Sequence, residues 1–480
     1  MLLWSEWTIF YNCGNKTVYF GNNVNERQEF EVEMKKFTKI FICLMLCLFS
    51  VVMVACDGRT PEEKAFTYPS RSDVVSSNGG MAVRKGDYIY FVNGYMTISD
   101  TDHVQNGSLT HGSLMLMRLD EYGNVVTDED GLLKDEYYIT MSDRLCGYEA
   151  TGLYIFGDYL YFTSPSQENT YDRDGNYEWA KDRVEFYRIK LDKTSGVERL
   201  FKSTVANTSL QYKYYDNGSD LYILINEKGT SLENDNKSDV LYRVKASNKA
   251  IDEVATGVSN LNMSDNGENV FYTKVENNVS KLYKYNVFTD GEVHFDTPTS
   301  ETFKALKLVS EDYVYITDEN DELYRRSLIN PNGSWEELGD YVGHYDKMLI
   351  IPHSDEIMTI KGNKVSVING ESRQMIDSDA SKINFIGFTN GGMVYYDDSN
   401  NIKIMDCETL EISTIITLGS KPTEMFDIAE DDTYMYFFMK QGANEYLYRV
   451  EVAFGESSEA EMLGVYIGDD APVVEDSEEE

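Results

Sequence analysis

The stretch Asp312-Tyr-Val-Tyr-Ile-Thr-Asp-Glu-Asn-Asp-Glu-Leu-Tyr-Arg-Arg326 has the pattern of a β-hairpin. Its first arm alternates tyrosines with Val314 and Ile316, and a period of two on such residues is typical of a strand. The polar run Asp318–Glu322 favours a turn, and Leu323-Tyr-Arg325 favours a returning strand.

The hairpin pattern recurs seven more times along the 480-residue chain. The central residues of the eight first arms are Tyr90, Tyr161, Tyr222, Tyr272, Tyr315, Met358, Tyr395 and Tyr436. From Tyr272 onward they are 37 to 43 residues apart, which suits a four-stranded propeller blade of roughly 40–50 residues. The sequence therefore predicts an all-β fold: a β-propeller of eight four-stranded blades, with seven as the alternative, over residues 81–467. Residues 460–467 are predicted to supply a closing strand.

Radial stacking would bury both faces of such sheets, because each blade covers its neighbour and leaves only short edges. Val314 and Tyr315 would then point into two different interfaces between blades. The repeat tyrosines are interpreted as packing residues whose hydroxyl ends remain wet, rather than as a carbohydrate-stacking surface.

Three long insertions separate the two arms of the first three hairpins. They lie at residues 93–113, 164–182 and 226–239 and are rich in Gly, Asn, Asp and Ser. Equivalent positions in successive repeats predict that they gather on one face of the ring. Within the second insertion, Asp172–Glu178 resembles the start of a calcium loop, but a polar hairpin turn explains the same residues.

The segment 34–55 has the layout of a secretory signal: the basic start Met34-Lys-Lys, an apolar run, and a small residue before the cut. Met53-Val-Ala-Cys56 resembles the lipobox of bacterial lipoproteins, in which the cysteine carries the lipid. Cys56 is therefore predicted to be the lipid-attachment residue. An ordinary signal peptide and an uncleaved anchor are the alternatives.

The remaining segments are assigned from composition. Residues 1–33 fit no signal and precede one with its own methionine, so they are interpreted as an over-extended leader, with a real cytoplasmic extension as the alternative. Residues 56–80 are predicted to be a flexible tether. Residues 468–480 are predicted to be an acidic, disordered tail.

Net charge and motifs limit the possible functions. The formal net charge is −39, and so acidic a surface repels phosphate backbones, which argues against nucleic-acid partners. The sequence has no G-x-S-x-G, P-loop or H-E-x-x-H motif, and its five histidines lack metal-ligand spacing. We therefore predict no catalytic residues, no metal site and no cofactor. Acidic residues are too abundant here for a carboxylate pair to indicate catalysis.

The D-x-[IVL]-Y-[FY] and L-Y-[RK] arms resemble the bacterial lipoprotein β-propellers related to the DUF5050 family and the YWTD-type propellers of receptors. The resemblance covers residues 81–467 and implies architecture more than function. The expected protein is a lipid-anchored propeller on the extracytoplasmic side of the cell membrane. It would bind or scaffold a protein, peptide or glycan on its insertion-bearing face. A glycoside hydrolase or lyase on the same scaffold is the alternative.

Overall fold

The computed structural model describes residues 59–466 with gaps. The gaps are residues 97–111, 130, 146–151, 167–168, 172–176, 180–182, 207–209, 230–238, 265, 278, 298–302, 331–332, 342–344, 355, 369–373, 390, 420–425, 430, 442–443 and 456. The segments predicted to be a leader (1–33), a signal (34–55) and an acidic tail (468–480), together with Cys56, lie outside the described residues. The described part contains no helix long and apolar enough to cross a membrane.

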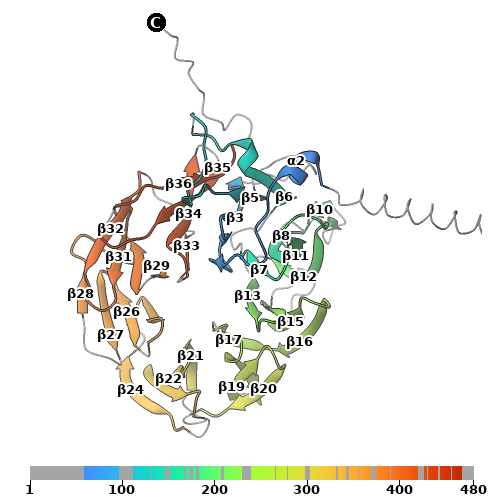
Figure 1. Ribbon diagram of the computed structural model, residues 1–480. Coiled ribbons are helices and arrows are strands. Elements are labelled where there is room, and N and C mark those ends of the chain that lie inside the picture. Colours follow the sequence, from blue (N-terminus) through green and yellow to red (C-terminus); the bar gives the residue numbers. More distant parts are fainter. Residues whose placement is uncertain are drawn as a thin grey trace, which may run out of the picture. The chain divides into compact units, whose positions relative to one another are not determined.

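Eight antiparallel sheets form a ring, and the predicted eight-bladed β-propeller is confirmed (Figure 1). Blade 1 contains β1 (Val75–Ser76), β2 (Ala82–Lys85), β3 (Tyr88–Val92), β5 (Ser113–Arg118) and β6 (Tyr138–Leu145). Blade 2 contains β7 (Tyr154–Phe156), β8 (Tyr159–Pro165), β11 (Arg183–Lys190) and β12 (Glu198–Ala206). Blade 3 contains β13 (Leu210–Asp216), β14 (Leu221–Glu227), β15 (Val240–Lys245) and β16 (Ala250–Thr256). Blade 4 contains β17 (Val258–Asn262), β18 (Val270–Glu276), β19 (Val279–Asn286) and β20 (Gly291–Phe295).

The second half of the ring repeats this order without long insertions. Blade 5 contains β21 (Phe303–Val309), β22 (Tyr313–Asp318), β23 (Glu322–Ser327) and β24 (Glu336–Tyr341). Blade 6 contains β25 (Lys347–Ile350), β26 (Ile357–Lys361), β27 (Lys364–Ile368) and β28 (Gln374–Ile376). Blade 7 contains β29 (Asn384–Thr389), β30 (Gly392–Tyr396), β31 (Asn401–Asp406) and β32 (Ile412–Thr417). Blade 8 contains β33 (Phe426–Ile428), β34 (Tyr434–Gln441), β35 (Asn444–Glu451) and β36 (Glu461–Leu463), the predicted closing strand.

Every repeated hairpin of the sequence is the central pair of strands in a blade. If the additional short strand β1 of blade 1 is left out of the count, all eight central residues, from Tyr90 to Tyr436, lie in the second strand of their blade, and the returning arms form the third. Val314 and Ile316 pack with Phe271 toward blade 4, whereas Tyr315 packs with Ile357 toward blade 6. Successive side chains thus enter the two different interfaces that the alternation predicted.

The tyrosine hydroxyls differ from the expectation of wet ends. Tyr90, Tyr395 and Tyr436 are completely buried. The Tyr90 hydroxyl donates to Leu191 O at 3.1 Å, and that of Tyr395 donates to Asp377 Oδ2 at 2.7 Å. The wide inter-blade interface encloses these three rings, so their hydroxyls take protein acceptors in place of water.

Arginines of the returning arms tie a blade to the next one. Arg188 Nη1 donates to Ala246 O at 2.9 Å, and Arg243 Nη1 donates to Val287 O at 3.2 Å. The Arg188 guanidinium also lies over the Tyr159 ring, 4.5 Å from its centroid. The arginine of the repeat therefore combines a cation–π contact within its blade with a hydrogen bond to the next blade.

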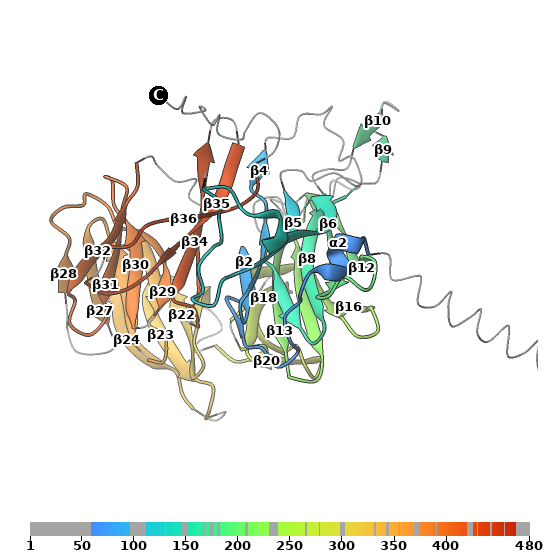
Figure 2. The ribbon, with the colours of Figure 1, turned by 45° about the horizontal axis from the view of Figure 1, so that its top comes forward.

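The ring closes where blade 8 meets blade 1. The short strand β4 (Tyr95–Met96), which follows the second strand of blade 1, pairs with the start of β35 (Figure 2). Asn93 Oδ1 accepts from Val465 N at 2.8 Å, and Asn93 Nδ2 donates to Val465 O at 3.2 Å. Gly94 has φ +65° and would place a Cβ only 2.0 Å from Glu445 O, so this crossing requires glycine.

The residues preceding the first repeat are docked on the ring, contrary to the expected flexible tether. The helix α2 (Pro61–Ala65) begins with a capping box between Thr60 and Glu63. Phe66 and Tyr68 then pack against the apolar cluster between blades 1 and 2. The strand β1 belongs to blade 1. The capping residues and two aromatic side chains explain why this polar segment is ordered.

Candidate functional site

The three long insertions are topologically equivalent. Each connects the second strand to the third in blades 1, 2 and 3, so all three emerge from the same side of adjacent blades. In blades 4 to 8 the same connection is short, as between Asp318 and Glu322. We call this side of blades 1–3 the insertion face. Its described parts include β4 and the separate hairpin of β9 (Asn169–Tyr171) and β10 (Tyr177–Trp179).

A buried carboxylate lies at the base of the second insertion. Glu185, near the start of β11, is 2% exposed. Its Oε1 accepts from Ser166 Oγ at 3.1 Å and from Arg199 Nη1 at 3.2 Å, and its Oε2 accepts from the Tyr187 hydroxyl. Ser166 precedes this insertion and Glu185 follows it, so their hydrogen bond joins the two ends of the insertion in blade 2.

A second buried carboxylate lies at the base of the third insertion. Glu227 ends β14 and accepts from Thr204 N and Thr204 Oγ1, both at 2.8 Å. The neighbouring Asn226 is also buried, and among the described residues its Oδ1 has no hydrogen-bond partner.

Three aspartates gather at the junction that closes the ring. Asp427 Oδ2 accepts from Met81 N at 2.8 Å, Asp431 Oδ1 from Ser77 N at 3.1 Å, and Asp432 Oδ2 from Ser77 Oγ at 2.7 Å. Burial and the nearby charges of Asp432 and Asp431 raise the pKa of Asp427 to about 6, although the Met81 amide opposes the shift. Each aspartate accepts a hydrogen bond from the segment 77–81. The cluster therefore links blade 8 to blade 1.

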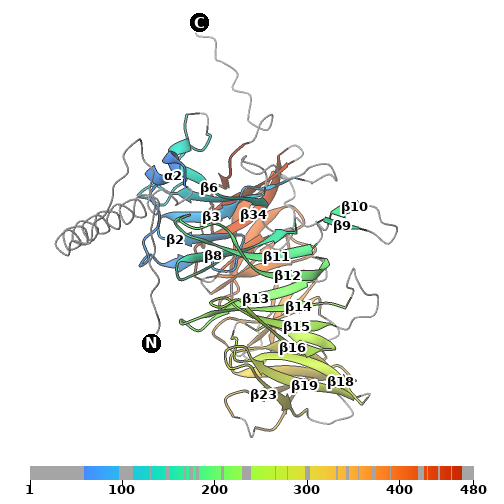
Figure 3. The same ribbon diagram turned by 90° about the vertical axis from the view of Figure 1, so that its right-hand side faces the viewer.

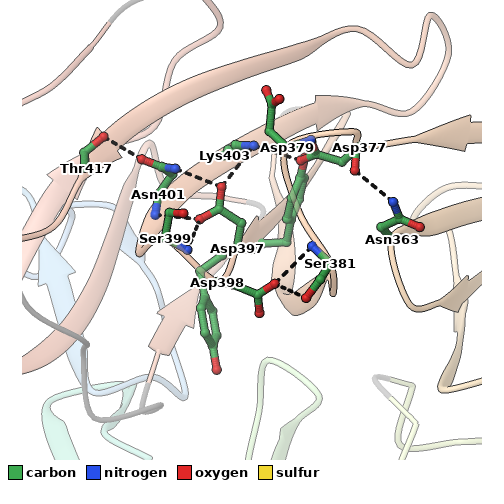
Figure 4. A network of polar contacts seen from close by, with 12 residues as sticks. Asn363, Asp377, Asp379, Ser381, Asp397, Asp398, Ser399, Asn401, Lys403 and Thr417 are labelled. Atoms are coloured by element: carbon green, nitrogen blue, oxygen red, sulfur yellow. Dashed lines mark hydrogen bonds and ion pairs between the residues drawn. The ribbon is translucent and has the colours of Figure 1, made fainter.

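A buried polar network joins blades 6 and 7 (Figure 4). Lys403 Nζ lies 2.9 Å from Asp377 Oδ2 and 3.0 Å from Asp397 Oδ2. Asp397 Oδ1 also accepts from the backbone of Ser399 and Asn401, which closes the turn before β31. One lysine and two carboxylates are thus fully hydrogen-bonded within the core.

This network has the protonation states of a structural ion pair. Burial raises the pKa of Asp377 and Asp397, but hydrogen bonds from Tyr395, Asn401 and Lys403 outweigh it, so both pKa values fall below the ordinary range. Burial lowers the pKa of Lys403, and its two aspartate partners more than reverse that effect. All three groups are charged at neutral pH, and none is left with the intermediate pKa that an acid–base catalyst needs.

The sequence-predicted site residues fall mostly outside this description. Cys56 and residues 172–176 of the possible calcium loop are not among the described residues. Among those that are, no group of three His, Cys, Asp or Glu side chains is arranged to hold a metal ion. His294 lies in the strand β20, and its Nδ1 is 3.4 Å from Asp296 Oδ1.

Glu185, Lys403 and Asp427 were not singled out from the sequence. Nothing distinguished Glu185 and Asp427 from the other acidic residues, because the chain carries 82 acidic side chains. The one usable signal was Lys403 itself, which stands in a returning arm between Ile402 and Ile404. A lysine at the position of an inward-facing tyrosine indicates a buried charge with partners.

Comparison with known proteins identifies no family. The chain matches no family model, and no curated protein resembles it significantly. Solved structures resemble it weakly. The C-terminal WD40 domain of Sif2 is 10% identical and aligns over 61% of this chain and 78% of its own, with a TM-score of 0.38. The computationally designed protein Ika8 is 11% identical over 68% of this chain and 92% of its own, with a TM-score of 0.40. An uncharacterized protein from Listeria monocytogenes is 8% identical and aligns over 58% of this chain and 85% of its own, with a TM-score of 0.38.

Proposed function

We propose that this protein is a non-catalytic binding or scaffolding module whose partner engages the insertion face. The partner is a protein, peptide or glycan. The observation that supports this proposal is the placement of all three long insertions between the second and third strands of three adjacent blades. Loops that vary in length on a rigid scaffold are where binding residues concentrate, and a propeller is commonly such a scaffold.

The bases of the insertions support a binding role further. The Glu185 and Glu227 carboxylates fix the strand ends from which the second and third insertions leave. A rigid base limits the conformational entropy that a loop loses on binding. The same carboxylates are fully occupied by donors, which makes them unsuited to acid–base chemistry.

The proposal includes a lipid anchor at Cys56, which places the module on the extracytoplasmic side of a bacterial cell membrane. The support is the succession of basic start, apolar run and Ala-Cys in the sequence. Intact-mass measurement of protein extracted from membranes should find diacylglycerol on Cys56. The Cys56→Ser variant should lack it, and an unmodified wild-type Cys56 would overturn the anchor.

The experiment for binding removes the insertions without disturbing the ring. Trimming must begin after Met96, because Asn93, Gly94 and β4 close the ring. Residues 97–111, 167–182 and 230–238 are therefore replaced by short turns. The trimmed protein should keep its thermal stability, because loop length contributes only small closure terms.

Capture of partners from an extract of the native host, by wild type and by trimmed protein, then provides the comparison. We expect partners bound by the wild type to be lost on trimming. A matched control replaces the exposed turn Ser247–Lys249 on the opposite face, which should leave capture unchanged. Retention of every partner by the trimmed protein would move the binding site elsewhere.

A further inference from the structure

The segment that joins the predicted anchor to the ring is attached to one specific face. Arg59 Nη1 lies 3.5 Å from Asp192 O, and Glu63 forms an ion pair with Lys193 in the same turn of blade 2. Lys193 Nζ also donates to Thr140 O at 2.6 Å in blade 1. This short helical segment therefore contacts blade 2 through a lysine that also bonds to blade 1.

The contacts that follow lie on the same side. Thr67 Oγ1 accepts from the Tyr88 hydroxyl at 3.0 Å and from Arg118 Nη1 at 3.2 Å. Lys85 Nζ donates to Asp73 O at 2.8 Å, and Gly86 N to Val74 O at 3.0 Å. We call this side, which carries the turns at Gly86 and Asp192, the anchor face.

The anchor face and the insertion face are at opposite ends of the strands. Tyr88 begins β3 and Arg118 ends β5, whereas the first insertion lies between Val92 and Ser113. In blade 2, β8 runs from Tyr159 beside the anchor face to Pro165 at the insertion. At about 3.3 Å per residue, seven residues separate the faces by roughly 20 Å. Figure 3 shows α2 and the hairpin β9–β10 on opposite sides of the ring.

The chain leaves little freedom between Cys56 and Arg59. Only residues 57 and 58 intervene, and three residue steps span at most about 11 Å. A flexible tether of 25 residues would instead have an end-to-end distance of about 25–30 Å. That length would let the ring turn in any direction relative to the anchor. Docking of residues 59–76 removes most of that tether.

We infer that the anchored protein stands with its anchor face toward the membrane and its insertion face directed away from it. This orientation rests on the lipid anchor at Cys56 proposed above. The insertion face then meets partners from the extracytoplasmic space, namely soluble or wall-attached macromolecules. It does not face integral proteins of the same bilayer.

The experiment measures energy transfer from each face to the membrane. The full chain, in a Cys146→Ser background, is reconstituted in phosphatidylcholine vesicles that contain an acceptor-labelled lipid. A donor dye is attached through an azidophenylalanine at position 228 or at position 248. Both native residues are exposed in blade 3: Lys228 follows β14 on the insertion face, and Asn248 follows β15 on the anchor face. We expect greater transfer from position 248.

A control separates docking from mere attachment. A Gly-Ser linker of about 25 residues inserted between Gly58 and Arg59 should make transfer from the two positions equal. Equal transfer without the linker, or greater transfer from position 228, would overturn the orientation. If intact mass shows no lipid on Cys56, the proposed anchor fails. Coupling Cys56 to a maleimide lipid in the same vesicles then still tests the orientation.

Discussion

Lys403 Nζ lies 2.9 Å from Asp377 Oδ2 and thereby joins the third strand of blade 7 to the end of blade 6. Both side chains are less than a tenth exposed. The pair lies in the half of the ring that carries no long insertion, where the repeats deviate most from the Leu-Tyr-Arg pattern. Lys403 thus bonds to the preceding blade, whereas Arg188 and Arg243 each bond to the blade that follows their own.

Replacing Lys403 should therefore be among the most destabilising single changes. Lys403→Met leaves the Asp377 and Asp397 carboxylates buried without their cation, at a cost of about 3–5 kcal/mol. Urea denaturation at pH 7 measures the loss. The matched control is Lys440→Met, which removes an exposed lysine 3.8 Å from Glu445 and should cost less than about 1 kcal/mol. Similar losses for the two variants would show that the network contributes little.

Asp427 should make the ring less stable as pH rises. Its pKa of about 6 in the folded protein lies above the value of 3.8 expected when unfolded. The folded protein therefore binds this proton more tightly, and the resulting stability, at most about 3 kcal/mol, is complete below pH 3.8 and lost as pH rises through 6. Chemical denaturation of Asp427→Asn and wild type between pH 4 and pH 8 should show a difference that changes across this window. The exposed Asp87→Asn should follow the wild type.

The fold could be predicted from the sequence because one interaction repeats eight times. The alternation at Tyr313–Ile316 indicates a strand that is buried on both faces. Each Leu-Tyr-Arg arm indicates the neighbouring strand that pairs with it. Of the tether predicted at 56–80, the described residues 59–80 are docked on the ring instead, because composition was weighed without its capping signal. Thr60-Pro-Glu-Glu63 has the pattern of a helix start and forms one.

The candidate site was less accessible to sequence reasoning. The positions of the insertions could be predicted, because they interrupt recognisable hairpins. The residues at the bases of the insertions could not be predicted. Glu185, for example, is distinguished by its hydrogen bonds to Arg199 and Ser166, and these form only in the folded blade. Ring closure by β4 and Asn93 could not be predicted from the sequence either, because it pairs residues more than 340 positions apart.

Truncation of a repeat side chain should measure the packing between blades. Ile316→Ala removes three carbons from a side chain that is 1% exposed between blades 4 and 5, and we expect a loss of about 2–5 kcal/mol. Val275→Ala, at a side chain that is 67% exposed in β18, should change stability by less than about 0.5 kcal/mol. Thermal and urea unfolding of both variants provide the measurement. A loss at Ile316 no larger than that at Val275 would contradict the buried interface.

Substitution of Gly94 tests how the ring closes. Gly94 and Gly123 both have positive φ, +65° and +84°, so alanine at either site adopts the left-handed region and should cost about 1–2 kcal/mol. Only at Gly94 would the new Cβ meet another blade, at 2.0 Å from Glu445 O, whereas at Gly123 it meets nothing within 4 Å. Gly94→Ala should therefore lose clearly more stability than Gly123→Ala. It should also speed hydrogen exchange at the β4–β35 pairing, since the clash displaces β4. Equal losses for the two variants, with unchanged exchange, would mean that β4 does not hold blade 8 to blade 1.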